Sequence, residues 1–142
     1  MLPKTSPIAE SSHPSSARIV VIDDEPMAQL HIAGLLQYLD CTTLGILSAD
    51  NAYATIRHQQ PQLVIVDLKL SNDPADGSGW TVLDQLNSDP FTADIPVIVI
   101  SAYTTARIHA RLTERGIKSV LEKPLQAVPF YAAVRPWLKR SP

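Results

Sequence analysis

Acidic side chains follow two apolar runs in this chain, and a lysine follows a third. Asp67 ends one run, Asp23 and Asp24 follow another, and Lys123 comes shortly after the third. If those runs are parallel strands of one sheet, their carboxyl ends meet at one edge, where open α/β sheets bind ligands. Three converging carboxylates repel one another, so a cation is expected among them. This set suits a divalent cation and the transfer of a phosphoryl group.

Short apolar or β-branched segments alternate with helical patterns and would place those side chains. The strands are predicted at 18–22, 42–47, 63–66, 95–100 and 118–121. The helices are predicted at 26–39, 50–59, 80–87, 105–115 and 127–140. Pro26 suits a first helical turn, Asp50 an N-cap and Gly116 the C′ position after a helix. Five strands alternating with five helices predict an α/β fold with a doubly wound, five-stranded parallel sheet.

The length of 142 residues predicts one domain. Residues 1–17 are rich in Ser and Pro, which predicts a flexible N-terminal tail before a domain at 18–140. The single Cys41 excludes an intramolecular disulfide and fits a reducing compartment. No apolar stretch approaches the roughly 20 residues that span a bilayer, so a cytoplasmic protein without membrane contact is expected.

Charge is unevenly distributed along the chain. Residues 1–100 hold 4 basic and 12 acidic side chains, whereas residues 101–142 hold 8 basic and 2 acidic ones. The basic part could face an acidic partner, or it could simply be a segregated, solvated surface. No nucleic-acid recognition motif accompanies it, so nucleic-acid binding is not expected.

Four motifs at the ends of predicted strands carry a resemblance to a known family. They are Ile22-Asp23-Asp24-Glu25-Pro26, Val66-Asp67-Leu68, Ile100-Ser101-Ala102 and Glu122-Lys123-Pro124. In this order the motifs resemble those of the receiver domain of two-component response regulators, over about residues 18–140. The resemblance implies a flavodoxin-like fold with strand order 2-1-3-4-5.

The resemblance also implies a role for each motif residue. Asp67 would be the phospho-acceptor, a carboxylate nucleophile that forms an aspartyl phosphate. Mg²⁺ would be bound by Asp24 directly, by Asp23 mainly through water, by Asp67, and by the backbone carbonyl of Lys69. Ser101 would donate a hydrogen bond to the phosphoryl group. Lys123 would pair with that group, and the Lys123–Pro124 peptide bond would be cis.

The function implied is that of a Mg²⁺-dependent receiver that signals by protein–protein contact. Its phosphodonor would be a phosphohistidine on a sensor histidine kinase or a histidine phosphotransfer protein. Its output would be a partner protein or a homodimer through the face of helix 4, strand 5 and helix 5. Such a chain is not an enzyme beyond its own phosphorylation and autodephosphorylation. Alternatives are a pseudo-receiver that binds partners without phosphorylation, and a fragment of a larger regulator or hybrid kinase.

The acidic residues are also compatible with other roles. Asp23 and Asp24 could cap the helix that begins near Pro26. A haloacid-dehalogenase-like phosphatase also uses an Asp nucleophile, but it needs Asp-x-Asp, and here Lys69 stands two residues after Asp67. Flavodoxin-like cofactor binding lacks a phosphate-cradling loop after the first strand.

Three departures from the family pattern leave the output mechanism open. The loop after Asp67 holds about four inserted residues around 72–74, which could alter kinase or phosphatase access or be a tolerated surface insertion. Val120 stands where many receivers carry a switch aromatic, so the usual rotamer switch cannot operate in its usual form. Pro136 should kink the last helix or end it early.

Overall fold

The computed structural model describes residues 17–69, 77–102 and 104–138. Five parallel strands form one sheet in the order β2-β1-β3-β4-β5. The strands are β1 (Ala17–Ile22), β2 (Cys41–Ile46), β3 (Leu63–Asp67), β4 (Val97–Ser101) and β5 (Ser119–Glu122). The helices are α2 (Pro26–Leu36), α3 (Ala52–Gln59), α4 (Ser78–Ser88), α5 (Ala106–Glu114) and α6 (Ala127–Val134), with a 3₁₀ helix η1 at Arg135–Leu138. This confirms the predicted fold class and strand order.

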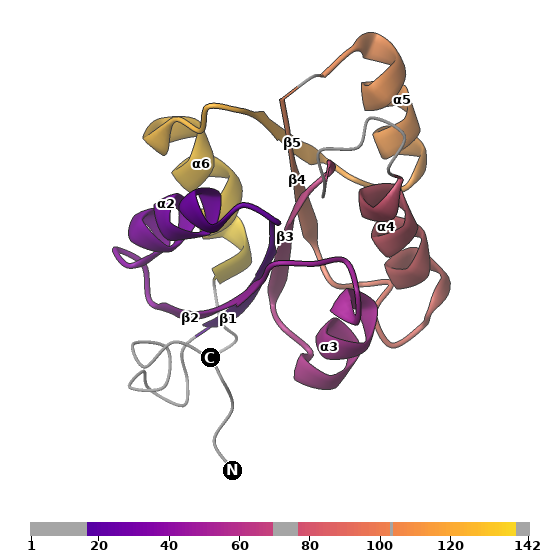
Figure 1. Ribbon diagram of the computed structural model, residues 1–142, viewed down its shortest axis with the longest axis horizontal. Coiled ribbons are helices and arrows are strands. Elements are labelled where there is room, and N and C mark those ends of the chain that lie inside the picture. The colour runs from indigo at the N-terminus through magenta and orange to yellow at the C-terminus, as the bar shows by residue number, and fades with distance from the viewer. Residues whose placement is uncertain (1–16, 70–76, 103, 139–142) are drawn as a thin grey trace.

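The helices form a layer on each face of the sheet (Figure 1). Helices α2 and α6 cover one face, and α3, α4 and α5 cover the other. Alternate residues of β3 point to opposite faces of the sheet. Val64 and Val66 pack toward α3 and α4. Leu63 and Ile65 pack toward α2 and α6. Strands covered on both faces are expected to be continuously apolar, as β3 is before Asp67.

Several element ends lie where the sequence predicted them, for local chemical reasons. Helix α2 begins at Pro26, where the missing N–H costs nothing because the first N–H groups of a helix have no partner within it. Helix α5 ends in a Schellman motif, because Gly116 has φ +78° and donates to the Thr113 carbonyl, while Ile117 donates to the Leu112 carbonyl. Within the described residues, no helix is both long and apolar enough to cross a membrane.

Other boundaries differ from the predictions. The first helix ends at Leu36 rather than near residue 39, and α3 begins at Ala52 after an N-cap at Asn51, so the expectation of an Asp50 N-cap was wrong. The last helix ends at Val134 and continues as η1, which confirms the disruption expected from Pro136. The predicted tail ends one residue too late, because Ala17 is the first residue of β1 and pairs with Cys41. Residues 1–16 of that tail and residues 70–76 of the loop with the insertion lie outside the described residues.

The carboxylate of Asp89, the C-cap residue of α4, joins that helix to α3. The Asp89 carboxylate accepts hydrogen bonds from the Tyr53 hydroxyl, from Arg57 Nε at 2.9 Å and from the Phe91 N–H at 2.9 Å. The Tyr53 hydrogen bond is the largest cause that lowers the pKa of Asp89, followed by the Phe91 N–H. Asp89 therefore binds its proton less readily in the folded state than in the unfolded chain.

Asp89→Asn is expected to lower the free energy of unfolding at neutral pH. Because the folded pKa of Asp89 is depressed, its contribution is complete above the unfolded pKa of about 3.9 and is lost as pH falls through the folded pKa. Urea unfolding of wild type and variant at pH 7 and in steps below pH 4 measures this. Asp94→Asn, at an exposed position nearby, is the control. A difference that stays constant with pH would contradict the assignment.

Gly79 is required where α4 meets the end of β3. A Cβ built at Gly79 would lie 2.0 Å from the Leu68 carbonyl oxygen and 2.7 Å from its carbonyl carbon. These are backbone atoms, which cannot rotate away. Gly79→Ala is therefore expected to destabilise the fold by about 3 kcal/mol, at the upper end of the usual cost of overpacking. Since Leu68 follows Asp67 directly, this packing also holds the chain beside Asp67.

Gly34→Ala is the matched control for that prediction. Gly34 lies inside α2 with nothing within 4 Å of a built Cβ, so the same substitution should stabilise the helix by about 0.5–1 kcal/mol. Denaturant unfolding of both variants tests the pair. Equal effects at Gly79 and Gly34 would show that helix propensity, rather than the Leu68 backbone, determines the outcome.

Candidate functional site

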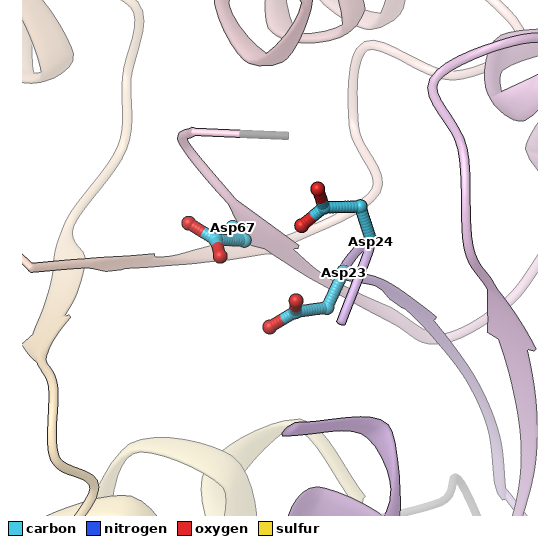
Figure 2. A group of neighbouring side chains, drawn as sticks. All are labelled: Asp23, Asp24 and Asp67. Carbon is cyan, nitrogen blue, oxygen red and sulfur yellow. The ribbon is translucent and has the colours of Figure 1, made fainter. Parts of the chain in front are cut away.

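The carboxyl ends of β1 and β3 bring the three predicted acidic residues together. β1 pairs with β3 in parallel, with Ile22 opposite Val66, so the residues that follow each strand meet at one edge. Oxygens of Asp23, Asp24 and Asp67 all lie within 4.8 Å of one another. Figure 2 shows the carboxylates of these residues pointing into the same space from the two neighbouring strand ends. This is also where the chain reverses its direction of winding across the sheet.

Lys123 reaches the acidic cluster from beyond β5. Its Nζ atom lies 2.6 Å from Asp67 Oδ2 and 3.4 Å from Asp23 Oδ2. The Lys123–Pro124 peptide bond is cis, as predicted. The Lys123 N–H donates to the Ser101 carbonyl at 3.0 Å, so the chain after β5 remains attached to the end of β4. The Lys123 ammonium group thus forms ion pairs with two carboxylates, those of Asp23 and Asp67.

Ser101 and Lys69 lie at the same edge of the sheet. Ser101 is buried at the end of β4, next to β3, where Asp67 pairs with Ile100. The Lys69 N–H donates to Asp67 Oδ1 at 3.0 Å, which leaves the two Asp67 oxygens with different neighbours. The structure therefore brings all six sequence-predicted site residues to one edge, while their chemical roles stay predictions.

Helix capping does not account for the acidic pair. The N-cap of α2 is Glu25, and it makes no side-chain capping hydrogen bond. Asp23 instead accepts the Glu25 N–H through Oδ1 at 3.0 Å, which shapes the loop between β1 and α2. Asp24 is the most exposed of the three acids, whereas Asp23 and Asp67 are buried. A buried carboxylate pair next to a third acid is an arrangement that favours a bound cation.

Burial, hydrogen bonds and neighbouring charges together set the pKa directions of Asp67 and Lys123. Burial raises the pKa of Asp67 above its ordinary value, and the Asp23 carboxylate adds to this, although Lys123 and the Lys69 N–H oppose it. Burial disfavours the ammonium of Lys123, but the hydrogen bond and charge of Asp67, followed by Asp23, outweigh burial and raise the pKa of Lys123. Three carboxylates face one ammonium, so negative charge exceeds what Lys123 neutralises, and further positive charge would favour the ionised form of Asp67.

These residues fit a small, oxygen-liganded cation. The donor set consists of carboxylates, it includes no thiol or imidazole, and one of its members remains accessible to solvent. Mg²⁺ prefers such oxygen ligands and keeps several of its waters, which Asp24 at the exposed side would allow. Asp23, Asp24 and Asp67 would hold the ion.

Comparison with known proteins agrees with the geometry of this edge. The family model described as "Response regulator receiver domain" matches residues 19–135, most of the chain. The chain belongs to the response regulator receiver family. This confirms the resemblance found from the four motifs, and it identifies the domain as a signalling module of two-component systems.

Individual relatives of this receiver are similar over nearly its whole length. It is 31% identical over 122 residues to the response regulator PleD of Caulobacter vibrioides, covering 84% of this chain and 26% of PleD. It is 28% identical over 124 residues to the DNA-binding dual master transcriptional regulator RpaA of Synechocystis, covering 87% of this chain and 50% of RpaA. The receiver thus spans half or less of these two regulators.

A solved structure shows the same arrangement of elements. The signal receiver domain from Vibrio parahaemolyticus described as that of a Luxo repressor protein superimposes with a TM-score of 0.77 at 26% identity. The match covers 88% of this chain and 92% of that domain. The fold that positions Asp67 is therefore the fold of the family.

One polar residue near the site was not selected from the sequence. The side-chain amide of Gln29, in α2, donates to the backbone carbonyl of Asp23 at 3.2 Å. Gln29 lies three residues before Ile32, a buried residue of the helix, and seven before buried Leu36. The available signal is a polar side chain spaced three and seven residues before buried positions of a largely apolar helix, because such a group needs a buried partner.

Proposed function

We propose that this receiver accepts a phosphoryl group on Asp67 from a phosphohistidine, with Mg²⁺ at the acidic cluster, and signals through protein contact. The donor would be a sensor histidine kinase or a histidine phosphotransfer protein. The observation that carries the proposal is the placement of Asp67, whose Oδ2 lies 2.6 Å from Lys123 Nζ and whose carboxylate adjoins Asp23 and Asp24. A nucleophile, a counter-charge and a set of cation ligands thus occupy one edge.

The proposed chemistry is an in-line displacement at phosphorus. A carboxylate oxygen of Asp67 forms the new P–O bond while the P–N bond to the donor imidazole breaks and the imidazole takes up a proton. Bound Mg²⁺ would supply positive charge to the phosphoryl oxygens. Lys123 would pair with the phosphoryl group as the charge on it moves toward Asp67. Ser101 would donate a hydrogen bond from its hydroxyl, and hydrolysis of the acylphosphate would return the carboxylate.

The proposed output face consists of α5, β5 and α6, which are the fourth helix, the fifth strand and the fifth helix along the chain. Its exposed basic residues include Arg107, Arg111 and Lys118, which would suit an acidic surface of a partner or of a second receiver. Val120 is partly buried against the core beside α4 and α5, so readout would have to use something other than an aromatic rotamer at that position. We also propose residues 17–140 as the receiver unit, because Ala17 is a buried residue of β1, with residues 1–16 as a tail.

The deciding experiment uses acetyl phosphate as a small phosphodonor. The wild-type chain is incubated with acetyl phosphate and Mg²⁺, or with the metal removed by chelator, and intact mass and peptide mapping locate any acylphosphate. The expected result is one metal-dependent, hydroxylamine-sensitive phosphoryl group. If neither acetyl phosphate nor a panel of histidine kinases phosphorylates the chain, the proposal is wrong and a partner-binding module without phosphorylation replaces it.

A further inference from the structure

The side-chain amide of Gln29 connects three backbone carbonyls around the acidic pair. Gln29 Nε2 lies 3.1 Å from the Val21 carbonyl oxygen, 3.2 Å from that of Asp23 and 2.9 Å from that of Ile46. All three contacts are acceptors, so the NH₂ end of the amide must face them. An amide nitrogen carries two hydrogens, so at least one of these hydrogens is shared between two carbonyls.

The Asp23 carbonyl is the informative acceptor. It belongs to the peptide group that joins Asp23 to Asp24, and a peptide group is planar from one Cα to the next. A hydrogen bond that holds this carbonyl therefore restricts the plane that carries both acidic residues. The Asp23 N–H is held as well, because it donates to the Ile46 carbonyl at 3.0 Å. Gln29 and the end of β2 thus hold Asp23 on both sides of its Cα.

Gly45 leaves the space that the Gln29 amide occupies. A Cβ built at Gly45 would lie 2.6 Å from Gln29 Oε1 and 3.2 Å from its Cδ. Among the residues that the structure describes, Gly116 is the glycine with positive φ, so Gly45 is not explained by a left-handed backbone. Glycine at this position instead leaves the space that the Gln29 amide fills.

We propose that Gln29, accommodated by Gly45, is a positioning residue that sets the geometry of Asp23 and Asp24 for cation binding. The proposal rests on the proposed Mg²⁺ site. The hydrogen bonds of the Gln29 amide go to backbone carbonyls and not to the carboxylate oxygens that would bind the cation. Gln29 would therefore act through the peptide group that joins Asp23 to Asp24. Loss of groups that orient metal ligands typically lowers metal affinity 10- to 100-fold.

The test measures Mg²⁺ affinity by calorimetric titration of the whole chain, beside urea unfolding. Gln29→Met keeps the length of the side chain and removes the donor, so Mg²⁺ should bind about tenfold more weakly. Gln37→Met, at an exposed position just after the same helix, is the matched control and should bind as wild type does. A folded Gln29→Met chain with wild-type Mg²⁺ affinity overturns the proposal.

Gly45→Ala separates positioning from stability. Its Cβ should displace the Gln29 amide, which can move because it ends a flexible side chain, while alanine is favoured over glycine in a strand. Mg²⁺ affinity should therefore fall while the free energy of unfolding stays level or rises. The double variant should bind Mg²⁺ no more weakly than Gln29→Met, because both changes remove the same contact.

The outcomes distinguish this proposal from the proposed function. If Gln29→Met does not fold, Gly45→Ala decides, and unchanged Mg²⁺ affinity there overturns the positioning role. If the wild-type chain binds Mg²⁺ and is phosphorylated while both variants match it, only the positioning role is wrong. If the wild-type chain binds no Mg²⁺, the proposed function fails first and the positioning role fails with it.

Discussion

Asp67→Asn is expected to abolish formation of the acylphosphate with acetyl phosphate and Mg²⁺. The substitution keeps the shape of the side chain, but an amide oxygen is not the carboxylate nucleophile that phosphoryl transfer needs. It also removes one of three clustered carboxylates, so Mg²⁺ should bind more weakly. Phosphoryl incorporation measured by intact mass should fall to the background of a reaction without phosphodonor.

Asp50→Asn is the matched control for the acceptor assignment. Asp50 is an exposed aspartate just before α3, so the same change of charge occurs away from the cluster, and incorporation should stay at the wild-type level. If Asp67→Asn still incorporates one full phosphoryl group, a residue other than Asp67 is the acceptor. Mapping of that group to Asp23 or Asp24 would keep the site but change the nucleophile within it.

Lys123→Met is expected to have opposite effects on phosphorylation and on cation binding. The Lys123 ammonium lies 2.6 Å from Asp67 Oδ2 and 3.4 Å from Asp23 Oδ2, where it neutralises part of the cluster. Without it, three carboxylates face the cation unopposed, so Mg²⁺ should bind more tightly. The rate of phosphoryl transfer should nevertheless fall about a hundredfold, the usual effect of removing one group that stabilises developing charge.

The split between the two measurements identifies the role of Lys123. Mg²⁺ affinity by calorimetry and the initial rate of phosphorylation at saturating Mg²⁺ are compared with those of Lys118→Met, which removes the same charge at an exposed position before β5. Lys118→Met should change neither quantity by much, because exposed charges at a distance are screened. A fall in both Mg²⁺ affinity and rate for Lys123→Met would point to general disruption of the site instead.

Local sequence chemistry determined much of this fold. Apolar or β-branched runs identified all five strands to within about two residues. The signal was clearest for the buried strands β1, β3 and β4, because strands covered on both faces are almost continuously apolar. Pro26, Gly116 and Pro136 marked a helix start, a helix end and a disrupted helix, because each changes what its own backbone can do. Asn51 was missed as the N-cap of α3, because the expected signal was a capping side chain from Asp50, whereas the N-cap found has a left-handed φ of 64° and makes no side-chain capping hydrogen bond.

The candidate site was predictable as a set of residues but not as a geometry. Charged residues at the ends of apolar runs, in family order, already indicated Asp23, Asp24, Asp67 and Lys123. The contact between Lys123 and Asp23 joins residues 100 positions apart, and it exists only because β1, β3, β4 and β5 pair in that order. Strand pairing over such separations depends on the packing of both helical layers, which local patterns do not encode.

Only the tertiary structure explains why Gln29, Gly45 and Gly79 stand at their positions. In the sequence they are a polar helix residue and two glycines, each compatible with an exposed position. In the folded chain a built Cβ at Gly79 meets the Leu68 carbonyl, and one at Gly45 meets the Gln29 amide that holds the Asp23 backbone. The sequence by itself determined which groups could do the chemistry. Close approach of distant backbone segments decided how they are held, because sequence patterns record residue types and not the space left between them.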